Sequence, residues 1–131
     1  MAFTVLFDPA RRVLLVRFGT ALTQAALEDM QAAVRRFVAA HGACPGIIDL
    51  SAVERTDVSS AFLAGLARQG AVLRGQKRIL VAPQDEIFGL SRMFGTHQAA
   101  TGEEPSIVRS LEQAYAVLGL DAPDWQPVDP G

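Results

Sequence analysis

Residues 46–60 read GIIDLSAVERTDVSS, and this stretch decides the type of fold. Residues 47–50 are a short, mainly apolar run, which is typical of a strand covered on both faces. Residues 57–60, DVSS, predict a helix start in which Asp57 is the N-cap and the helix runs from the next residue. The intervening residues 51–56 form a displayed loop. A buried strand that leads through a loop into a helix is characteristic of α/β proteins.

Two further strands and a helix precede this unit. Residues 3–7 and 12–18 are apolar runs joined at Asp8-Pro9, a turn-forming pair, and they predict an antiparallel hairpin. Thr23 precedes apolar positions spaced three and four apart, so we expect it to cap a helix that stops at Gly42. This is the clearest helix in the sequence.

Strands and helices also alternate after residue 60. The helix from residue 58 carries apolar positions as far as Leu73, and residues 78–82 predict a second buried parallel strand. A third helix begins at Gln84 or Asp85. The chain then continues with an edge strand at residues 106–109 and a final helix from Ser110, which forms a capping box with Gln113 and stops at Gly119.

The predicted architecture is one α/β domain over residues 1–120. It has a mixed sheet of about five strands and about four helices, in the order strand, strand, helix, strand, helix, strand, helix, strand, helix. Residues 121–131 form a Pro-rich tail, which we expect to be mobile unless Trp125 packs against the domain.

Composition excludes several classes of function. The 131 residues include 12 basic and 14 acidic side chains, with a net charge of −2 and no long run of either sign, which disfavours nucleic-acid binding. Cys44 is the only cysteine, so neither an internal disulfide nor a thiolate metal cluster is expected. No signal peptide or membrane-spanning segment is evident. We therefore expect a soluble cytoplasmic protein without membrane insertion.

The predicted helix start at residues 57–60 is the main candidate site. Its backbone N–H groups and positive dipole end would accommodate a phosphate on Ser59 or Ser60, although the carboxylate of Asp57 would repel it. The alternative is that these are an ordinary cap and first helical turn. Both interpretations stay open.

Other reactive side chains fit structural roles better than catalysis. Asp49 ends a buried strand, where a carboxylate usually accepts hydrogen bonds from loop N–H groups. His41 and Cys44 lack a third group to orient them, and His97 has no second ligand at metal-binding spacing. No Gly-rich phosphate loop follows a strand. We therefore expect no cofactor, no metal site and no enzymatic activity.

The element order and the residues around Asp57 resemble the STAS domain, the fold of anti-sigma factor antagonists and of the cytoplasmic ends of sulfate transporters. The resemblance covers about residues 3–120. In that family the third strand ends in a pattern like Asp-Leu-Ser, as at residues 49–51, and the next helix opens with Asp-Ser-Ser-Gly. Residues 107–114, IVRSLEQA, also look like the family's last strand and helix start.

The resemblance implies a signalling module that binds proteins. The second Ser of the family motif is phosphorylated by a kinase that doubles as an anti-sigma factor, and Ser59 occupies that position here. Asp57 matches the motif Asp, while Val58 replaces the first Ser and Ser60 replaces Gly. A glycine there permits close approach by a partner's backbone. The implied partner-binding face comprises Asp57, Val58 and Ser60 around the phosphoacceptor.

The third helix suggests a second surface. Its apolar residues lie on more than one face, so Phe88 and Met93 would form an exposed patch for a protein partner, a second copy of the chain or an apolar ligand. Alternatively, Gly89 and Gly95 let the helix bend and bury them. The alternative function is a small-ligand or lipid-binding domain whose third helix and hairpin enclose an apolar pocket near Phe88 and Phe94.

Overall fold

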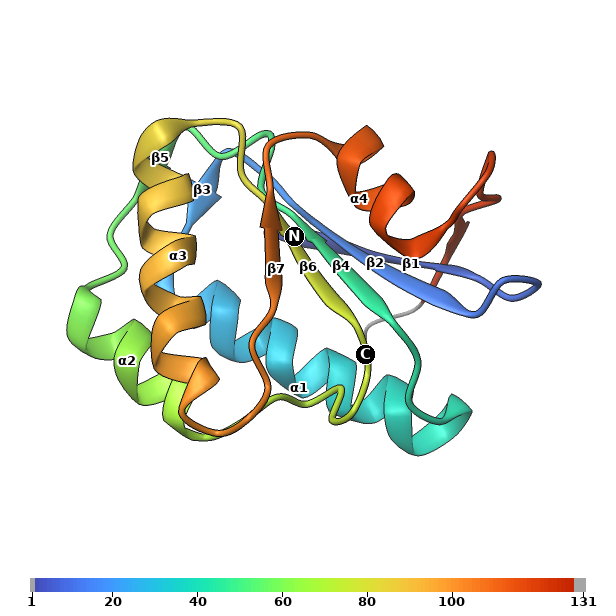
Figure 1. The fold of residues 1–131 in the computed structure, drawn as a ribbon, viewed down its shortest axis with the longest axis horizontal. Coiled ribbons are helices and arrows are strands. Elements are labelled where there is room, and N and C mark those ends of the chain that lie inside the picture. The colour runs from blue at the N-terminus through green and yellow to red at the C-terminus, as the bar shows by residue number, and fades with distance from the viewer. Residues whose placement is uncertain (1, 129–131) are drawn as a thin grey trace.

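The computed structural model describes residues 2–128 and shows the expected mixed α/β architecture with four helices (Figure 1). The strand count differs slightly from the prediction, because three two-residue strands join the five expected ones. The strands are β1 (Phe3–Asp8), β2 (Val13–Phe18), β3 (Ala21–Leu22), β4 (Gly46–Asp49), β5 (Arg55–Thr56), β6 (Arg78–Val81), β7 (Ser106–Val108) and β8 (Gln126–Pro127). The helices are α1 (Gln24–His41), α2 (Ser60–Arg68), α3 (Asp85–Ala99) and α4 (Leu111–Leu118).

Six strands form the main sheet in the order β7-β6-β4-β2-β1-β8. Strands β1 and β2 are the predicted antiparallel hairpin, whereas β2, β4, β6 and β7 run parallel. Strand β7 is the expected edge strand. The short strands β3 and β5 pair with each other in a separate parallel sheet.

Helices cover both faces of the main sheet. Helices α1, α2 and α3 gather on one side, and α4 with the C-terminal segment lies on the other (Figure 1). Side chains alternate along β2 accordingly: Leu14 and Val16 pack with the three helices, while Val13 and Leu15 pack with α4. The parallel strands are therefore buried on both faces, as their apolar sequences predict.

The predicted caps of α1 and α4 are confirmed. The hydroxyl of Thr23 accepts a hydrogen bond from Ala26 N at 3.0 Å, and Gly42 ends α1. Ser110 accepts from Gln113 N at 3.1 Å, and Gly119 ends α4 in the left-handed region at φ +67°. These short-range patterns were sufficient to predict where α1 begins and ends and where α4 begins and ends.

Helix α2 begins and ends at other residues than expected. The N-cap is Ser59 and not Asp57, and the helix stops at Arg68 instead of extending to Leu73. The start is delayed because the Thr56 hydroxyl donates to Leu22 O at 2.8 Å and accepts from Val58 N at 3.1 Å, which holds the chain extended. The end follows from Gly70, whose φ of +83° is incompatible with a helix.

The C-terminal segment packs against the sheet as far as residue 128. Trp125 Nε1 donates to the Tyr115 hydroxyl at 2.9 Å, and Asp124 N donates to the carboxylate of Asp8 at 2.9 Å. Strand β8 pairs antiparallel with β1. The packing of Trp125, which the sequence left open, is thus present in the structure.

Candidate functional site

The start of α2 presents three of its four candidate side chains to solvent. Asp57, Ser59 and Ser60 are exposed, whereas Val58 is only 8% exposed and packs into the main core. The Ser59 hydroxyl accepts a hydrogen bond from Phe62 N at 3.1 Å, so it is the helix N-cap. The buried Val58 side chain therefore anchors this segment to the main core, and the polar residues on either side of it face solvent.

The loop that leads to this helix start is held at its beginning by Asp49. One carboxylate oxygen accepts from Ser51 N at 3.0 Å and from the Ser51 hydroxyl at 2.5 Å. The other oxygen lies 3.4 Å from Arg17 Nε. The structural role predicted for Asp49 is confirmed, since the buried carboxylate bonds the loop and an ion-pair partner.

Two neighbouring segments hold the rest of the loop. The side chain of Gln84, just before α3, donates to Ser51 O at 2.8 Å and to Val53 O at 2.9 Å. Further along, Glu54 N and Arg55 N both donate to Thr20 O, and β5 pairs with β3. The exposed start of α2 is therefore a fixed surface feature at the end of a well-bonded loop.

A groove of about 380 Å³ runs between α1 and α2 next to this helix start. The side of α2 that borders it carries Ala61, Phe62 and Gly65, which directly follow the candidate serines in the sequence. This groove was not predicted from the sequence. Small residues four apart, as at 61 and 65, lie on one face of a helix and are the signal that could have indicated it.

Phe88 does not join this surface. It lies in the first turn of α3, and Figure 1 shows the start of α3 well apart from the start of α2. The Arg109 guanidinium covers the Phe88 ring at 3.7 Å from its centroid and also binds Asp85 Oδ1 at 2.7 Å.

Phe88, Met93 and Phe94 are all partly buried against the main core. Among the described large hydrophobic residues, only Val117 is exposed, at 41%. The structure therefore favours the alternative in which α3 packs its apolar residues inward.

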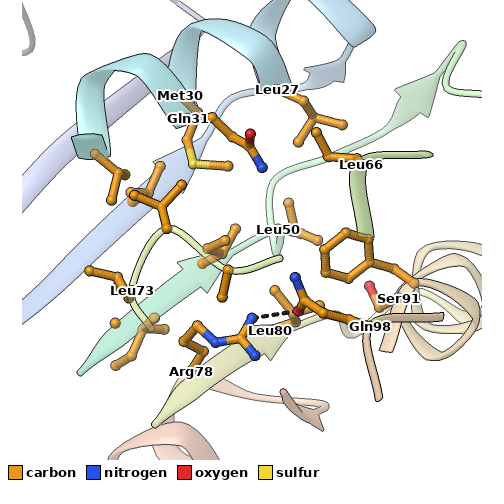
Figure 2. Close-up of a pocket in the computed structure, with 18 of the residues that line it drawn as sticks. Leu27, Met30, Gln31, Leu50, Leu66, Leu73, Arg78, Leu80, Ser91 and Gln98 are labelled. Carbon is orange, nitrogen blue, oxygen red and sulfur yellow. Dashed lines mark hydrogen bonds between the residues drawn. The ribbon is translucent and has the colours of Figure 1, made fainter. Parts of the chain in front are cut away.

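A cavity of about 130 Å³ lies between the three helices and the sheet (Figure 2). Leu27, Met30 and Gln31 reach into it from α1, and Arg78 and Gln98 lie opposite them. Phe94 contributes to its wall but Phe88 does not, and the hairpin contributes only residues of β2. The pocket expected from the sequence therefore exists, but α1 and α2 enclose it together with α3.

No sequence motif predicts the polar end of this cavity. Arg78 NH1 donates to Gln98 Oε1 at 2.5 Å, joining the first residue of β6 to the last turn of α3. Gln98 is only 2% exposed. A basic residue at the start of an otherwise apolar buried strand was the only sequence signal.

Two further features, a metal-ligating cluster and a membrane-spanning helix, are absent from residues 2–128. The described residues contain no cluster of three or more metal-ligating side chains. Within residues 2–128, none of the helices combines the length and apolar character needed to cross a membrane.

Comparison with solved structures finds the anti-sigma factor antagonist SpoIIAA in its unphosphorylated form. The TM-score is 0.57 at 18% sequence identity, and the match covers 91% of this chain and 100% of the SpoIIAA chain. The fold is that of a STAS domain. No protein-family model matches the sequence, and no curated protein does either.

Proposed function

We propose that this protein is a non-enzymatic regulatory module that binds a protein partner through the exposed start of α2. The observation that carries the proposal is the exposed Ser59 hydroxyl, which caps α2 in a chain with the STAS fold. The docking face consists of Asp57, Ser59 and Ser60, together with the adjoining groove between α1 and α2. Its partner is an anti-sigma factor or a related kinase in the cytoplasm.

Phosphorylation of Ser59 would switch this face. The kinase would transfer the γ-phosphoryl group of ATP to Ser59 Oγ, releasing ADP, while the hydroxyl proton passes to a base of the kinase. The phosphate adds a charge of about −1.5 to −2 at neutral pH. The helix dipole tolerates this charge, but the exposed carboxylate of Asp57 repels it, and a partner could bury the face only by desolvating a dianion. Docking is therefore favoured in the unmodified state.

The test is a pull-down from the native organism with wild-type, Ser59→Ala and Ser59→Asp proteins, combined with intact-mass analysis of the native protein. We expect Ser59→Asp to lose a kinase-like partner that Ser59→Ala retains, and the native protein to carry phosphate on Ser59. Ser110→Asp is the matched control, because Ser110 caps α4 on the other side of the sheet. If all four proteins recover the same partners and Ser59 is unmodified, the switch is refuted.

The cavity between the helices favours a second function, the binding of a small ligand inside the domain. Its lining is almost entirely apolar, with the Arg78–Gln98 pair at one end. This function does not depend on phosphorylation of Ser59.

A further inference from the structure

The cavity has the size of a small organic molecule. Its volume of about 130 Å³ is close to the roughly 150 Å³ of an apolar engineered cavity that binds benzene. Leucine, isoleucine, valine and methionine side chains form most of its wall, and none of the described residues that line it is acidic. An apolar body of about six non-hydrogen atoms therefore fits the interior.

The orientation of the Gln98 amide is fixed by Arg78. A guanidinium can only donate hydrogen bonds, so the Gln98 atom that faces Arg78 NH1 at 2.5 Å must be the amide oxygen. The amide nitrogen consequently points away from Arg78, toward the interior of the cavity (Figure 2). It donates to no other described residue. Gln98, 2% exposed, thus offers two N–H donors to the cavity.

Arg78 adds positive charge at the same end. Its Nε is buried and has no hydrogen-bond partner among the described residues, while NH2 donates to the Glu103 carbonyl oxygen. The ion pairs of Arg11, Arg17 and Arg109 do not involve Arg78, and no carboxylate of residues 2–128 lies within 4.0 Å of its guanidinium. Burial lowers the pKa of Arg78, and the charge of Glu103 opposes that shift. A half-buried cation of this kind is stabilised by a nearby anion.

We propose that the cavity binds a small apolar carboxylate, with the carboxylate group at Gln98 Nε2 and Arg78 and the apolar body against Leu27, Met30 and Leu66. This inference rests on the second function proposed above and gives its ligand class. The Gln98 amide and the guanidinium supply donors beside the Ser91 hydroxyl, which can donate or accept, and the positive charge of the guanidinium selects a negative acceptor group. A small aromatic or branched-chain carboxylate, with an apolar body of no more than about six non-hydrogen atoms, suits both the interior and the polar end.

The groove between α1 and α2 provides the route of access. Gln31 and Leu66 line both the groove and the cavity, so they form the partition between them. The Gln31 side-chain oxygen accepts from Arg35 NH2 at 3.2 Å on the outside of α1.

The test compares benzoate with toluene, a neutral molecule of similar shape, by titration followed with NMR of the uniformly ¹⁵N-labelled protein. We expect both to bind, with benzoate about tenfold or more tighter because a charged hydrogen-bonded group adds affinity. Benzoate should also shift the side-chain amide signals of Gln98 more strongly than toluene does, because only benzoate accepts hydrogen bonds from that amide.

Gln98→Glu is the sharpest variant, because it keeps the size of the side chain and places a carboxylate beside Arg78. It should abolish the preference for benzoate while toluene still binds, which also shows that the cavity remains folded. Equal affinities of wild-type protein for benzoate and toluene would refute the carboxylate assignment. Binding of neither would refute the ligand-binding function itself, and the Ser59 pull-down would be unaffected by either result.

Discussion

On the face of the sheet covered by α4, Leu15, Ile79, Val81 and Ala114 are 0% exposed, whereas the opposite face borders a cavity of about 130 Å³. The strands supply similar apolar side chains to both faces, so the difference lies in what covers them. Helix α4 approaches closely because the small residue Ala114 faces the sheet. Three helices meeting over the other face leave space that their side chains do not fill.

This difference separates two roles within one small domain. The α4 face buries its central residues completely, and this burial contributes stability. The face with three helices carries both the exposed start of α2 and the cavity, and α2 borders both, because Leu63 and Leu66 line the cavity. Both proposed binding sites therefore lie on the side of the sheet opposite α4.

Adjacent residues of β6 provide the most direct test of unequal packing. Ile79 belongs to the cluster under α4 and is 0% exposed, while Leu80 lines the cavity. We expect Ile79→Ala to lower the free energy of unfolding by about 4 kcal/mol and Leu80→Ala by about 2 to 3 kcal/mol. The Leu80 side chain has fewer neighbouring atoms to lose, because part of its surface already faces empty space.

The measurement is equilibrium urea unfolding of both variants beside the wild type. Unchanged m values would show that the comparison concerns the folded state. A loss at Leu80 equal to or greater than that at Ile79 would contradict the proposed difference between the two faces.

Adding volume gives the converse comparison. Ala114→Leu on α4 should destabilise the protein by about 1 to 3 kcal/mol, because the site has no room for the larger side chain. Ala71→Leu places the same groups beside the cavity and should change the free energy of unfolding by less than about 1 kcal/mol. Thermal unfolding of the pair checks both values, and a large loss from Ala71→Leu would show that the cavity cannot be filled.

Local sequence patterns were sufficient to predict the main elements and the STAS resemblance. Thr23, Ser110 and Gly119 act on residues within one turn, so the ends of α1 and α4 could be read directly. The start of α2 was misplaced because it depends on a contact between Thr56 and Leu22, which are 34 residues apart. Strands of two residues, such as β3 and β5, carry no periodic signal.

The sites depend even more on long-range contacts. The sequence identified Ser59 by motif, but it could not show that Arg109 covers Phe88 from 21 residues away or that Arg78 orients the amide of Gln98. A cavity arises from how helices meet and not from any single segment. Its existence could be suggested by the surplus of apolar residues on α3, but its wall and its polar end could not.

The side of the sheet covered by α4 also contains the buried carboxylate of Asp8. Its titration provides the test with the smallest expected effect. Asp8 is 0% exposed and accepts hydrogen bonds from Ala10 N, Arg11 N and Asp124 N. The bond from Arg11 N is the main cause that lowers the pKa of Asp8 below its ordinary value of 3.8; burial opposes the shift, and the Asp124 N–H and the Arg11 guanidinium add to it.

Because the pKa of Asp8 is lower in the folded state, its carboxylate stabilises the protein above about pH 3.8 and loses that effect as the pH falls through the folded value. Trp125, the only tryptophan, follows Asp124, so its fluorescence reports on this segment. We expect acid unfolding of the wild type to shift to higher pH in Asp8→Asn, which lacks the charge. Since α4 and the C-terminal segment share this side of the sheet, the Trp125 signal should change before binding of the neutral probe toluene in the opposite cavity is lost. Simultaneous loss of both signals would show that the two sides unfold as one unit, with no difference between them in acid.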